Sequence, residues 1–268
     1  MHGGDALQWL ANALKKCFCK TQHATTQTPA FHALVGRTPI IRLRALLHNA
    51  QVCVYIKAEQ LNPSGSVFDR YADKVTKHAP THAKYAVVSE KIGGEAASLA
   101  MALAPAGYRV RARIAASQEL PTGTKKLHDA LGVQQVSENY HVVDDGMCWD
   151  ADSVFQVDDV VEEVRRDILD EIYEQMAQVE KEYASQVVDV WFAVDDVEGG
   201  NNTADKSTPL CGLKPTDAMA WIATNEGLLV SPRTAAMVAR AASALSSGTE
   251  KHRAIVVVAH ETGERYVV

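Results

Sequence analysis

The stretch QVCVYIKAEQLNPSGSVFDR, residues 51–70, decides the fold, because it passes from an apolar run through a loop into a helix. Apolar residues on both faces favour a buried strand over residues 51–60. The loop NPSGSVFDR, residues 62–70, contains the turn-forming residues Asn, Pro, Ser and Gly. A helix is expected to follow over residues 69–79. This order, strand then loop then helix, is the repeating unit of an α/β protein.

The same alternation continues along the chain. Strands are expected at KYAVVSE (84–90), RVRARIAAS (109–117), VVDVWFAV (187–194) and AIVVVAH (254–260), and helices at GEAASLAMALAPAGY (94–108) and PTGTKKLHDALG (121–132). Strands that alternate with helices predict a mostly parallel sheet. The 268 residues, 47% of them hydrophobic, suffice for one large domain or two modest ones.

Composition excludes several classes of function. The net charge of -6 argues against non-specific binding to nucleic acid or anionic lipid as the main role, and no motif points to sequence-specific recognition of nucleic acid. No apolar run reaches the length of a membrane span. Five cysteines form no CxxC pair, which favours a reducing, intracellular setting and no metal site.

The N-terminal segment, residues 1–30, is expected to be an amphipathic helix followed by a polar linker. Leu7, Leu10 and Leu14 lie on one face of that helix, with Phe18 completing it. The segment is either a mitochondrial targeting signal or a docking helix, so the sequence leaves a mitochondrial and a cytoskeletal or cytoplasmic location undecided.

A second amphipathic segment, residues 157–183, predicts one long helix with an acidic face. Residues 158–182 hold ten acidic and three basic side chains, a net charge of -7. Two interpretations stay open: a solvated face, or an electrostatic docking surface for a basic partner.

Four blocks in this order resemble the cysteine synthase and cystathionine beta-synthase family: VGRTPIIRL (35–43), IKAEQLNPSGSVFDR (56–70), KKLHDALGVQQV (125–136) and ETGERYVV (261–268). The resemblance implies the tryptophan-synthase-beta-like fold (fold type II pyridoxal phosphate enzymes), with mostly parallel sheets and a shortened large domain. Residues 31–268 would form this region. Its small subdomain would span about 70–150, and the large subdomain would hold the remainder, including the acidic helix.

The resemblance also locates the family's cofactor lysine, in the motif N-P-S-x-S-x-K. Phe68 stands at that position. A phenyl ring has no amine to form a Schiff base and no proton to move at a substrate carbon. The sequence therefore predicts no catalytic residue at the degenerate position Phe68.

The family's other cofactor loops match only in part. In VSEKIGG (88–94), Glu90 replaces a glycine, and in VDDVEGGNN (194–202) new carboxylates lie where the family binds phosphate. The resemblance leaves six vestigial cofactor positions: Ser89, Lys91, Gly93, Gly199, Gly200 and Ser231. No bound cofactor is expected at them.

These departures predict a cysteine-synthase-like pseudoenzyme, not an enzyme, that serves as a structural or interaction subunit of a larger intracellular assembly. A homologous cysteine-synthase-like dimer partner is one expected subunit. The N-terminal helix and the acidic helix are the expected docking surfaces. Two alternatives stay open: a non-catalytic sensor of a small ligand, and a pyridoxal phosphate enzyme whose lysine has moved to Lys91.

Overall fold

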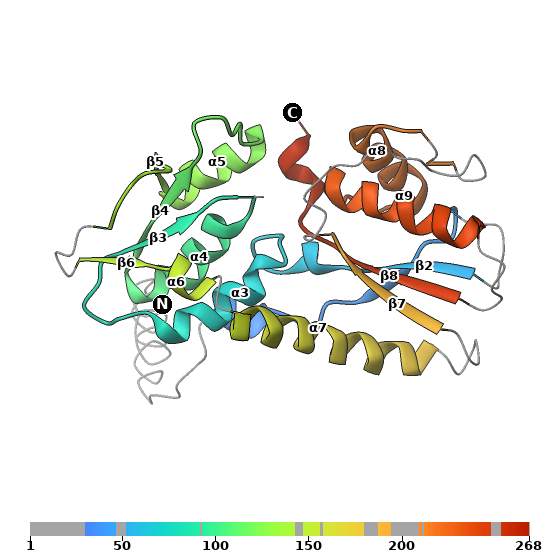
Figure 1. Ribbon diagram of the computed structural model, residues 1–268, viewed down its shortest axis with the longest axis horizontal. Coiled ribbons are helices and arrows are strands. Elements are labelled where there is room, and N and C mark those ends of the chain that lie inside the picture. The colour runs from blue at the N-terminus through green and yellow to red at the C-terminus, as the bar shows by residue number, and fades with distance from the viewer. Residues whose placement is uncertain are drawn as a thin grey trace, which may run out of the picture.

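The computed structural model places two sheets side by side with helices packed around them (Figure 1). The structure describes residues 30–46, 52–91, 93–142, 147–155, 158–179, 187–193, 209–210, 212–247 and 253–267. The predicted N-terminal helix and linker lie outside these residues, apart from Ala30. None of the described helices is long and apolar enough to cross a membrane.

The first sheet has the strand order β1-β2-β8-β7. Its strands are β1 (Ile40–Arg42), β2 (Val52–Lys57), β7 (Val187–Phe192) and β8 (Arg253–Val258). β8 runs parallel to both of its neighbours, and β1 joins the edge antiparallel to β2. β8 lies at the centre because AIVVVAH is apolar on both faces, which suits a strand covered on both sides.

The second sheet has the strand order β5-β4-β3-β6, and all its pairs are parallel. Its strands are β3 (Tyr85–Ser89), β4 (Arg109–Ile114), β5 (Gln134–Ser137) and β6 (Cys148–Asp150). The prediction of an α/β fold with mostly parallel sheets is confirmed. The predicted subdomain boundaries stay a prediction.

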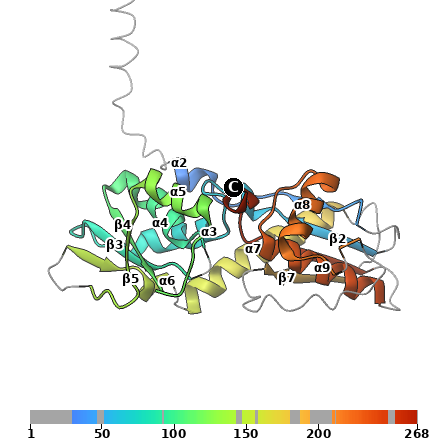
Figure 2. The same cartoon turned by 90° about the horizontal axis from the view of Figure 1, so that it is seen from above.

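Helices cover the sheets, and most begin or end where the sequence signals it. They are α2 (Ala30–Leu34), α3 (Phe68–Val75), α4 (Glu95–Leu103), α5 (Thr122–Leu131), α6 (Asp152–Phe155), α7 (Asp158–Val179), α8 (Pro215–Glu226) and α9 (Pro232–Ser247). Short 3-10 turns span Glu59–Leu61, Thr76–His78, Ala104–Ala106 and Gly263–Tyr266. Gly132 ends α5 with φ +69°, the left-handed conformation that favours glycine after a helix. Figure 2 shows the two sheets from above, on either side of the middle of α7.

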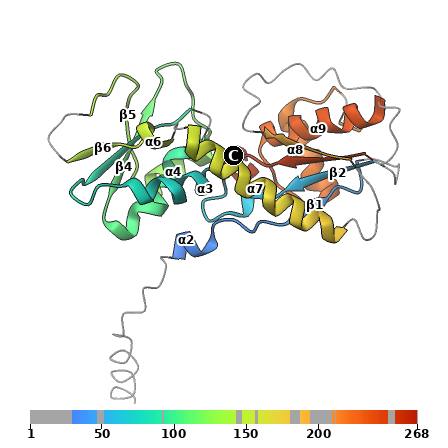
Figure 3. The ribbon, with the colours of Figure 1, turned by 60° about the horizontal axis from the view of Figure 1, so that its bottom comes forward.

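Helix α7 is the long amphipathic helix that the sequence predicts, confirmed over Asp158–Val179. Residues 180–183 of the prediction lie outside the described residues. Its buried stripe consists of Val160, Val164, Ile168, Ile172 and Met176, at the spacing of one helix face. The helix runs along the first sheet, and its N-terminal end reaches α3 and α6 in the other half (Figure 3). It therefore ties the two halves of the molecule together, and its residues join the core that also holds the second sheet.

The C-terminal turn packs directly on α5 at Gly123. A Cβ atom at this position would lie 2.5 Å from the Cα of Arg265, and backbone atoms cannot move aside as a flexible side chain can. We expect Gly123→Ala to lower the free energy of unfolding by about 3 kcal/mol, measured by urea denaturation. Gly107→Ala is the control: its Cβ would meet no atom within 4 Å, so only its φ of +81° opposes the change, at about 1 kcal/mol. An equal loss in both variants would contradict the proposed close packing.

Candidate functional site

Phe68 begins α3 and lies in the core, 7% exposed. Its ring packs edge-on against His260, with 5.8 Å between the ring centroids, and tilted against Tyr71, at 5.6 Å. Its backbone N–H donates to Ser66 Oγ at 3.2 Å. The position of the family's lysine is therefore filled by an aromatic ring that packs against the C-terminal segment.

The polar residues of the loop around Phe68 shape the loop itself. Asp69 accepts hydrogen bonds from the Ser64 N–H at 2.7 Å and from the Ser64 hydroxyl at 2.5 Å. Burial raises the pKa of Asp69, although these bonds oppose the shift. Asn62 donates to the backbone oxygen of Glu59 at 2.9 Å and to its side chain at 2.7 Å. These motif residues persist because they satisfy buried polar groups within the loop.

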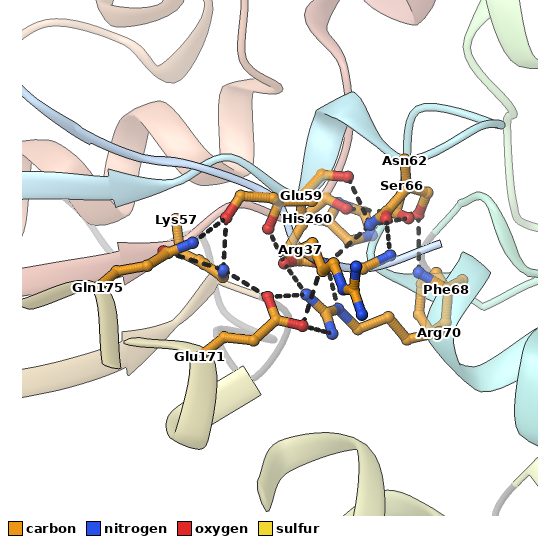
Figure 4. A network of polar contacts seen from close by, with 12 residues as sticks. Arg37, Lys57, Glu59, Asn62, Ser66, Phe68, Arg70, Glu171, Gln175 and His260 are labelled. Carbon is orange, nitrogen blue, oxygen red and sulfur yellow. Dashed lines mark hydrogen bonds and ion pairs between the residues drawn. The ribbon is translucent and has the colours of Figure 1, made fainter. Parts of the chain in front are cut away.

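Next to this loop lies a buried ionic network that joins β2, α3 and α7 (Figure 4). Arg70 donates through Nε and Nη2 to Glu59, and through Nη1 and Nη2 to Glu171, at 2.7–2.8 Å. Lys57 Nζ donates to Glu171 at 2.7 Å, to the Thr38 carbonyl oxygen at 2.6 Å and to Gln175 at 3.2 Å. Two cations and two carboxylates thus satisfy one another in a site that is almost closed to water.

Pairing decides the direction of the pKa shift for Glu171 and Arg70, whereas burial decides it for Lys57. Burial opposes the charged form of Glu171, but the hydrogen bonds from Arg70 and Lys57 lower its pKa to about 2. Burial likewise disfavours the charged Arg70, yet its bonds to Glu171 and Glu59 raise its pKa. Burial lowers the pKa of Lys57 despite Glu171. The sequence analysis did not assign this cluster, because Glu171 lies 114 residues from Lys57 and only the fold joins them.

The loop between β3 and α4 carries three of the predicted vestigial positions. Ser89 donates from its hydroxyl to Asp152 at 2.7 Å, and its backbone N–H donates to the same carboxylate at 2.8 Å. Lys91 is exposed, and its carbonyl oxygen accepts from Gln118 at 3.3 Å. Gly93 has φ +101° and faces Glu261, whose Oε1 would lie 3.2 Å from a Cβ atom there. Ser89 is thus already engaged within the protein.

Glu90 lies between Ser89 and Lys91 in the sequence. Its side chain is buried and caps the N-terminus of α4. Its Oε1 accepts from the Gly94 N–H at 2.7 Å and its Oε2 from the Ala96 N–H at 2.8 Å. Burial raises the pKa of Glu90 to about 7, against the effect of these two amides and of Arg265.

The C-terminal segment, residues 260–266, follows β8 and contacts the loop around Phe68. Arg265 donates to Glu261 at 2.7 Å and to the Ser64 carbonyl oxygen at 2.7 Å, and Tyr266 donates to Glu261. Burial lowers the pKa of His260 to about 4. Ser231 also lies here. Its backbone N–H donates to the Glu261 carbonyl oxygen at 3.0 Å, and its Oγ lies 3.1 Å from the hydroxyl of Thr234.

Phe68, Gly93 and Ser231 meet at the C-terminal segment, where they lie against His260 or Glu261. Ser89 instead bonds to Asp152, and Lys91 is exposed. Gly199, Gly200 and the acidic residues near them lie outside the described residues. Within the described residues, no group of three or more His, Cys, Asp or Glu side chains forms a metal site. His128, His260 and Arg265, which sequence reasoning did not assign, belong to the same region. The block ETGERYVV was the signal that could have pointed to Arg265.

The pyridoxal-phosphate-dependent enzyme family matches residues 32–196, more than half of the chain. The chain belongs to this family. The resemblance to cysteine synthase and cystathionine beta-synthase is confirmed at this level by relatives and by solved structures of the same kind.

Among curated proteins, this cysteine-synthase-like chain is 39% identical over 70 residues to an N-(2-amino-2-carboxyethyl)-L-glutamate synthase from Cupriavidus metallidurans, covering 26% of this chain and 20% of the relative. It is 36% identical over 88 residues to an O-ureido-L-serine synthase from Streptomyces lavendulae, covering 30% and 27%. It is 29% identical over 102 residues to an O-acetylserine dependent cystathionine beta-synthase from Bacillus subtilis, covering 37% and 33%. These matches span a fifth to a third of each relative.

Solved structures show the same fold over nearly the whole chain. An O-ureido-L-serine synthase superposes with a TM-score of 0.63 at 20% identity, covering 90% of this chain and 93% of that one. A cysteine synthase from Entamoeba histolytica gives a TM-score of 0.60 at 15% identity, covering 91% and 90%. At these identities the likeness establishes the tryptophan-synthase-beta-like fold and not the activity.

Family membership corrects one expectation. The replacement of the cofactor lysine by Phe68 predicted that the chain is no enzyme, yet the family is one of enzymes and the matched relatives are named as synthases. That prediction is contradicted by these relatives. Its physical weakness is that Phe68 excludes one covalent bond at one position, and this does not decide whether other side chains support a reaction.

The residues at the family's lysine position do not fit a covalently held cofactor. Phe68 has no amine, and its ring is packed against His260 and Tyr71. The neighbouring loop carries the buried Glu90, whose carboxylate already takes the amides of Gly94 and Ala96. Phe68 therefore offers pyridoxal phosphate no covalent anchor.

Proposed function

We propose that this cysteine-synthase-like protein serves as an interaction subunit of a larger assembly, and that it binds a basic partner surface through the outward face of α7. One observation carries the proposal: an exposed tyrosine lies within the acidic face of α7, and the opposite face of this helix is packed against the rest of the protein.

The inner side of α7 is committed to the fold. Its apolar stripe is buried, and Glu171 is bound by Arg70 and Lys57. Lys74 Nζ also reaches the helix, at 2.5 Å from Glu163 and 2.8 Å from Asp167. Part of the acidic charge that the sequence shows is thus neutralised within the molecule, and the backbone of α7 is held in place.

The outer side of α7 remains acidic and contains one large aromatic ring. Asp159, Glu162, Asp170 and Glu174 are exposed, and Tyr173 is 57% exposed. Spacings of three, four, eight and eleven residues place these side chains on one face of the helix. An exposed aromatic ring among charges resembles the anchor residues of protein interfaces, where the ring contributes most of the binding energy and the charges select the partner.

Binding should therefore depend on this face and on salt. We expect the triple variant Asp170→Lys, Tyr173→Ala, Glu174→Lys to lose at least about tenfold in affinity for a partner that the wild-type full-length chain captures. Raising the salt concentration should weaken the wild-type complex, because exposed charges are screened. The measurement is quantitative affinity capture followed by a binding titration with the purified partner.

Glu119→Lys is the matched control, since Glu119 is 92% exposed and lies on another surface. It changes the net charge in the same direction without touching α7. A partner that binds the triple variant as tightly as the control would contradict the proposal.

Lys91 carries the second candidate function, a pyridoxal phosphate enzyme with a relocated lysine. Family membership and the exposure of Lys91 favour it. The test is borohydride reduction in the presence of pyridoxal phosphate, followed by peptide mapping with Lys91→Met as the control. An adduct at Lys91 that appears at stoichiometric cofactor would support this candidate. Adducts spread over exposed lysines would count against it.

A further inference from the structure

The two faces of the second sheet differ in chemical character. One face belongs to the core through small apolar residues of β3 and β4, such as Val88 and Val110. A parallel sheet is usually covered by helices on both faces, so its central strands are apolar on both sides. The central strand β4 departs from this rule, because its other face carries Arg109, Arg111 and Arg113.

The polar residues on this side of the sheet form one continuous surface, which we name the arginine face. Alternate residues of a strand point to the same side, and the strand register places those of neighbouring strands next to one another. All of them are exposed or half-buried, and none belongs to either apolar cluster of the described core. The arginine face consists of Tyr85, Arg109, Arg111, Arg113, Gln134, Cys148 and Asp150.

Arg111 lies at the middle of the arginine face and is held in a fixed position. The central carbon of its guanidinium group lies 3.9 Å from the centroid of the Tyr85 ring. Its Nη1 donates to the hydroxyl of Tyr140 at 2.5 Å, and its Nε donates to Gln134 at 3.2 Å. A stacked guanidinium loses little conformational freedom when it binds a partner, so its ordering costs little affinity.

Two of the three arginines carry a charge that no described carboxylate neutralises. Arg113 is bound by Asp150 at 2.7 Å and by Asp152 at 2.6 Å. Among the described residues, the contacts of Arg111 are all with uncharged groups, and Arg109 is exposed and forms no ion pair. The arginine face therefore suits an acidic partner, and arginine and tyrosine are also the residues in which protein interfaces are enriched.

The outward face of α7 is an acidic surface of this kind, and it carries an aromatic ring of its own. It presents four exposed acids, one exposed arginine and one exposed tyrosine: Asp159, Glu162, Asp170, Glu174, Arg166 and Tyr173. The inner side of α7 is held by its buried apolar stripe and by the ion pairs of Glu171. The helix is therefore not free to swing onto the arginine face of its own molecule, whereas a second molecule can bring the two surfaces together.

We propose that the outward face of α7 in one copy of this chain binds the arginine face of a second copy. This inference rests on the proposed function of α7, and it names the basic surface that α7 binds. The two surfaces are different, so the contact is head to tail and not a two-fold symmetric pair. Its repetition produces a closed ring or an open chain of molecules.

Analytical ultracentrifugation of the full-length chain tests this proposal. We expect the mean mass of the wild type to rise with protein concentration and to fall when salt is added, because the contact joins exposed charges. One variant reverses the charge of α7, with Asp170→Lys and Glu174→Lys. A second variant reverses the arginine face, with Arg109→Glu and Arg111→Glu. Each variant alone should associate at least about tenfold more weakly than the wild type, because like charges then face one another.

Mixing the two charge-reversed variants is the decisive step. The basic α7 of the first variant matches the acidic sheet face of the second, and the two unchanged surfaces still match each other. An equimolar mixture should therefore recover the association that each variant has lost, which a general loss of stability could not produce. Arg109→Glu alone, at an exposed position, replaces the second variant if Arg111→Glu disturbs the fold as measured by circular dichroism.

A matched control carries the same change of charge on other surfaces. Glu119→Lys with Asp129→Lys alters two exposed acids outside both surfaces and should associate as the wild type does. A wild type that stays monomeric at low salt would overturn the inference, as would a mixture that fails to recover association. The affinity capture with the α7 triple variant decides the proposed function separately: a different basic partner lost by that variant would leave the role of α7 intact while the arginine face is excluded.

Discussion

Arg70→Ala is expected to lower the free energy of unfolding by about 3–5 kcal/mol. Glu59 is fully buried, and Arg70 is its bidentate partner, at 2.7 and 2.8 Å. Removing the guanidinium leaves this carboxylate inside the protein with its main counter-charge gone. Glu171 loses two of its hydrogen bonds at the same time. The measurement is urea denaturation followed by circular dichroism, at a pH near 7 where both carboxylates are ionised in the unfolded state.

Two matched variants separate the network from the general loss of an arginine. Arg166→Ala removes an exposed arginine on α7 and should change stability by less than about 0.5 kcal/mol. Arg70→Lys keeps the charge but loses the planar fork that spans Glu59 and Glu171, so it should recover only part of the loss. If Arg70→Ala were no more destabilising than Arg166→Ala, the network would not hold α7 in place.

The strands could be predicted from the sequence because each is a short apolar run whose burial does not depend on distant residues. The runs 84–90 and 254–260 became β3 and β8, and the loop 62–70 could be placed because its Asn, Ser and Asp side chains bond within it. Helix α7 was predicted for the same reason, since its apolar spacing is local. Antiparallel β1 was not predicted, because its pairing with β2 arises from an edge of the sheet.

The site was harder to predict because its contacts join residues far apart in the chain. Glu171 was counted only as one acid in a charged face, yet it is the half-buried partner of Lys57 and Arg70. The sequence shows Glu90 only as a carboxylate in place of a glycine. The structure shows it turned inward onto the amides of Gly94 and Ala96, an arrangement that depends on two glycines with positive φ. The residue types indicated that the site differs from that of the family, and only the fold shows which contacts these residues make.

Stability should pass through a maximum near pH 6.5, because three buried groups between the sheets titrate in opposing directions. The pKa of Glu90 is raised by burial from 4.5 to about 7, so the folded protein binds the extra proton between these values and loses stability as pH rises. The pKa values of His128 and His260 are lowered by burial from 6.5 to about 4, so the unfolded chain binds more protons there and stability rises with pH.

Between about pH 4.5 and 6.5 the two histidines outweigh Glu90 by one proton, so the free energy of unfolding should rise by roughly 1.4 kcal/mol per pH unit. Above 6.5 only Glu90 still titrates, and stability should fall slightly up to about pH 7. Burial raises the pKa of Asp69 from 3.8, so the folded protein keeps this proton above pH 3.8 and the rise is smaller at its acidic end. Glu171 acts below pH 4.5, where its folded pKa of about 2 makes stability fall with further acid.

Glu90→Gln isolates the contribution of Glu90, since the amide does not titrate. The free energy of unfolding of this variant, relative to the wild type, should increase as pH rises from about 4.5 to 7, by a total on the order of 3 kcal/mol. His128→Gln is the opposing control: it removes one of the two histidines, so the rise in stability between pH 4.5 and 6.5 should nearly vanish. Urea titrations at half-unit steps of pH measure all three proteins.

This measurement also shows which of two opposing effects sets the pKa of Glu90. Burial and the neighbouring Glu261 favour the neutral acid, whereas the two amides at the start of α4 and Arg265 favour the carboxylate. A difference between Glu90→Gln and wild type that stays constant from pH 4.5 to 7.5 would mean that the amides prevail and that Glu90 remains ionised throughout. A difference that grows with pH would mean that burial prevails, and Glu90 is then a charged carboxylate only near and above neutral pH.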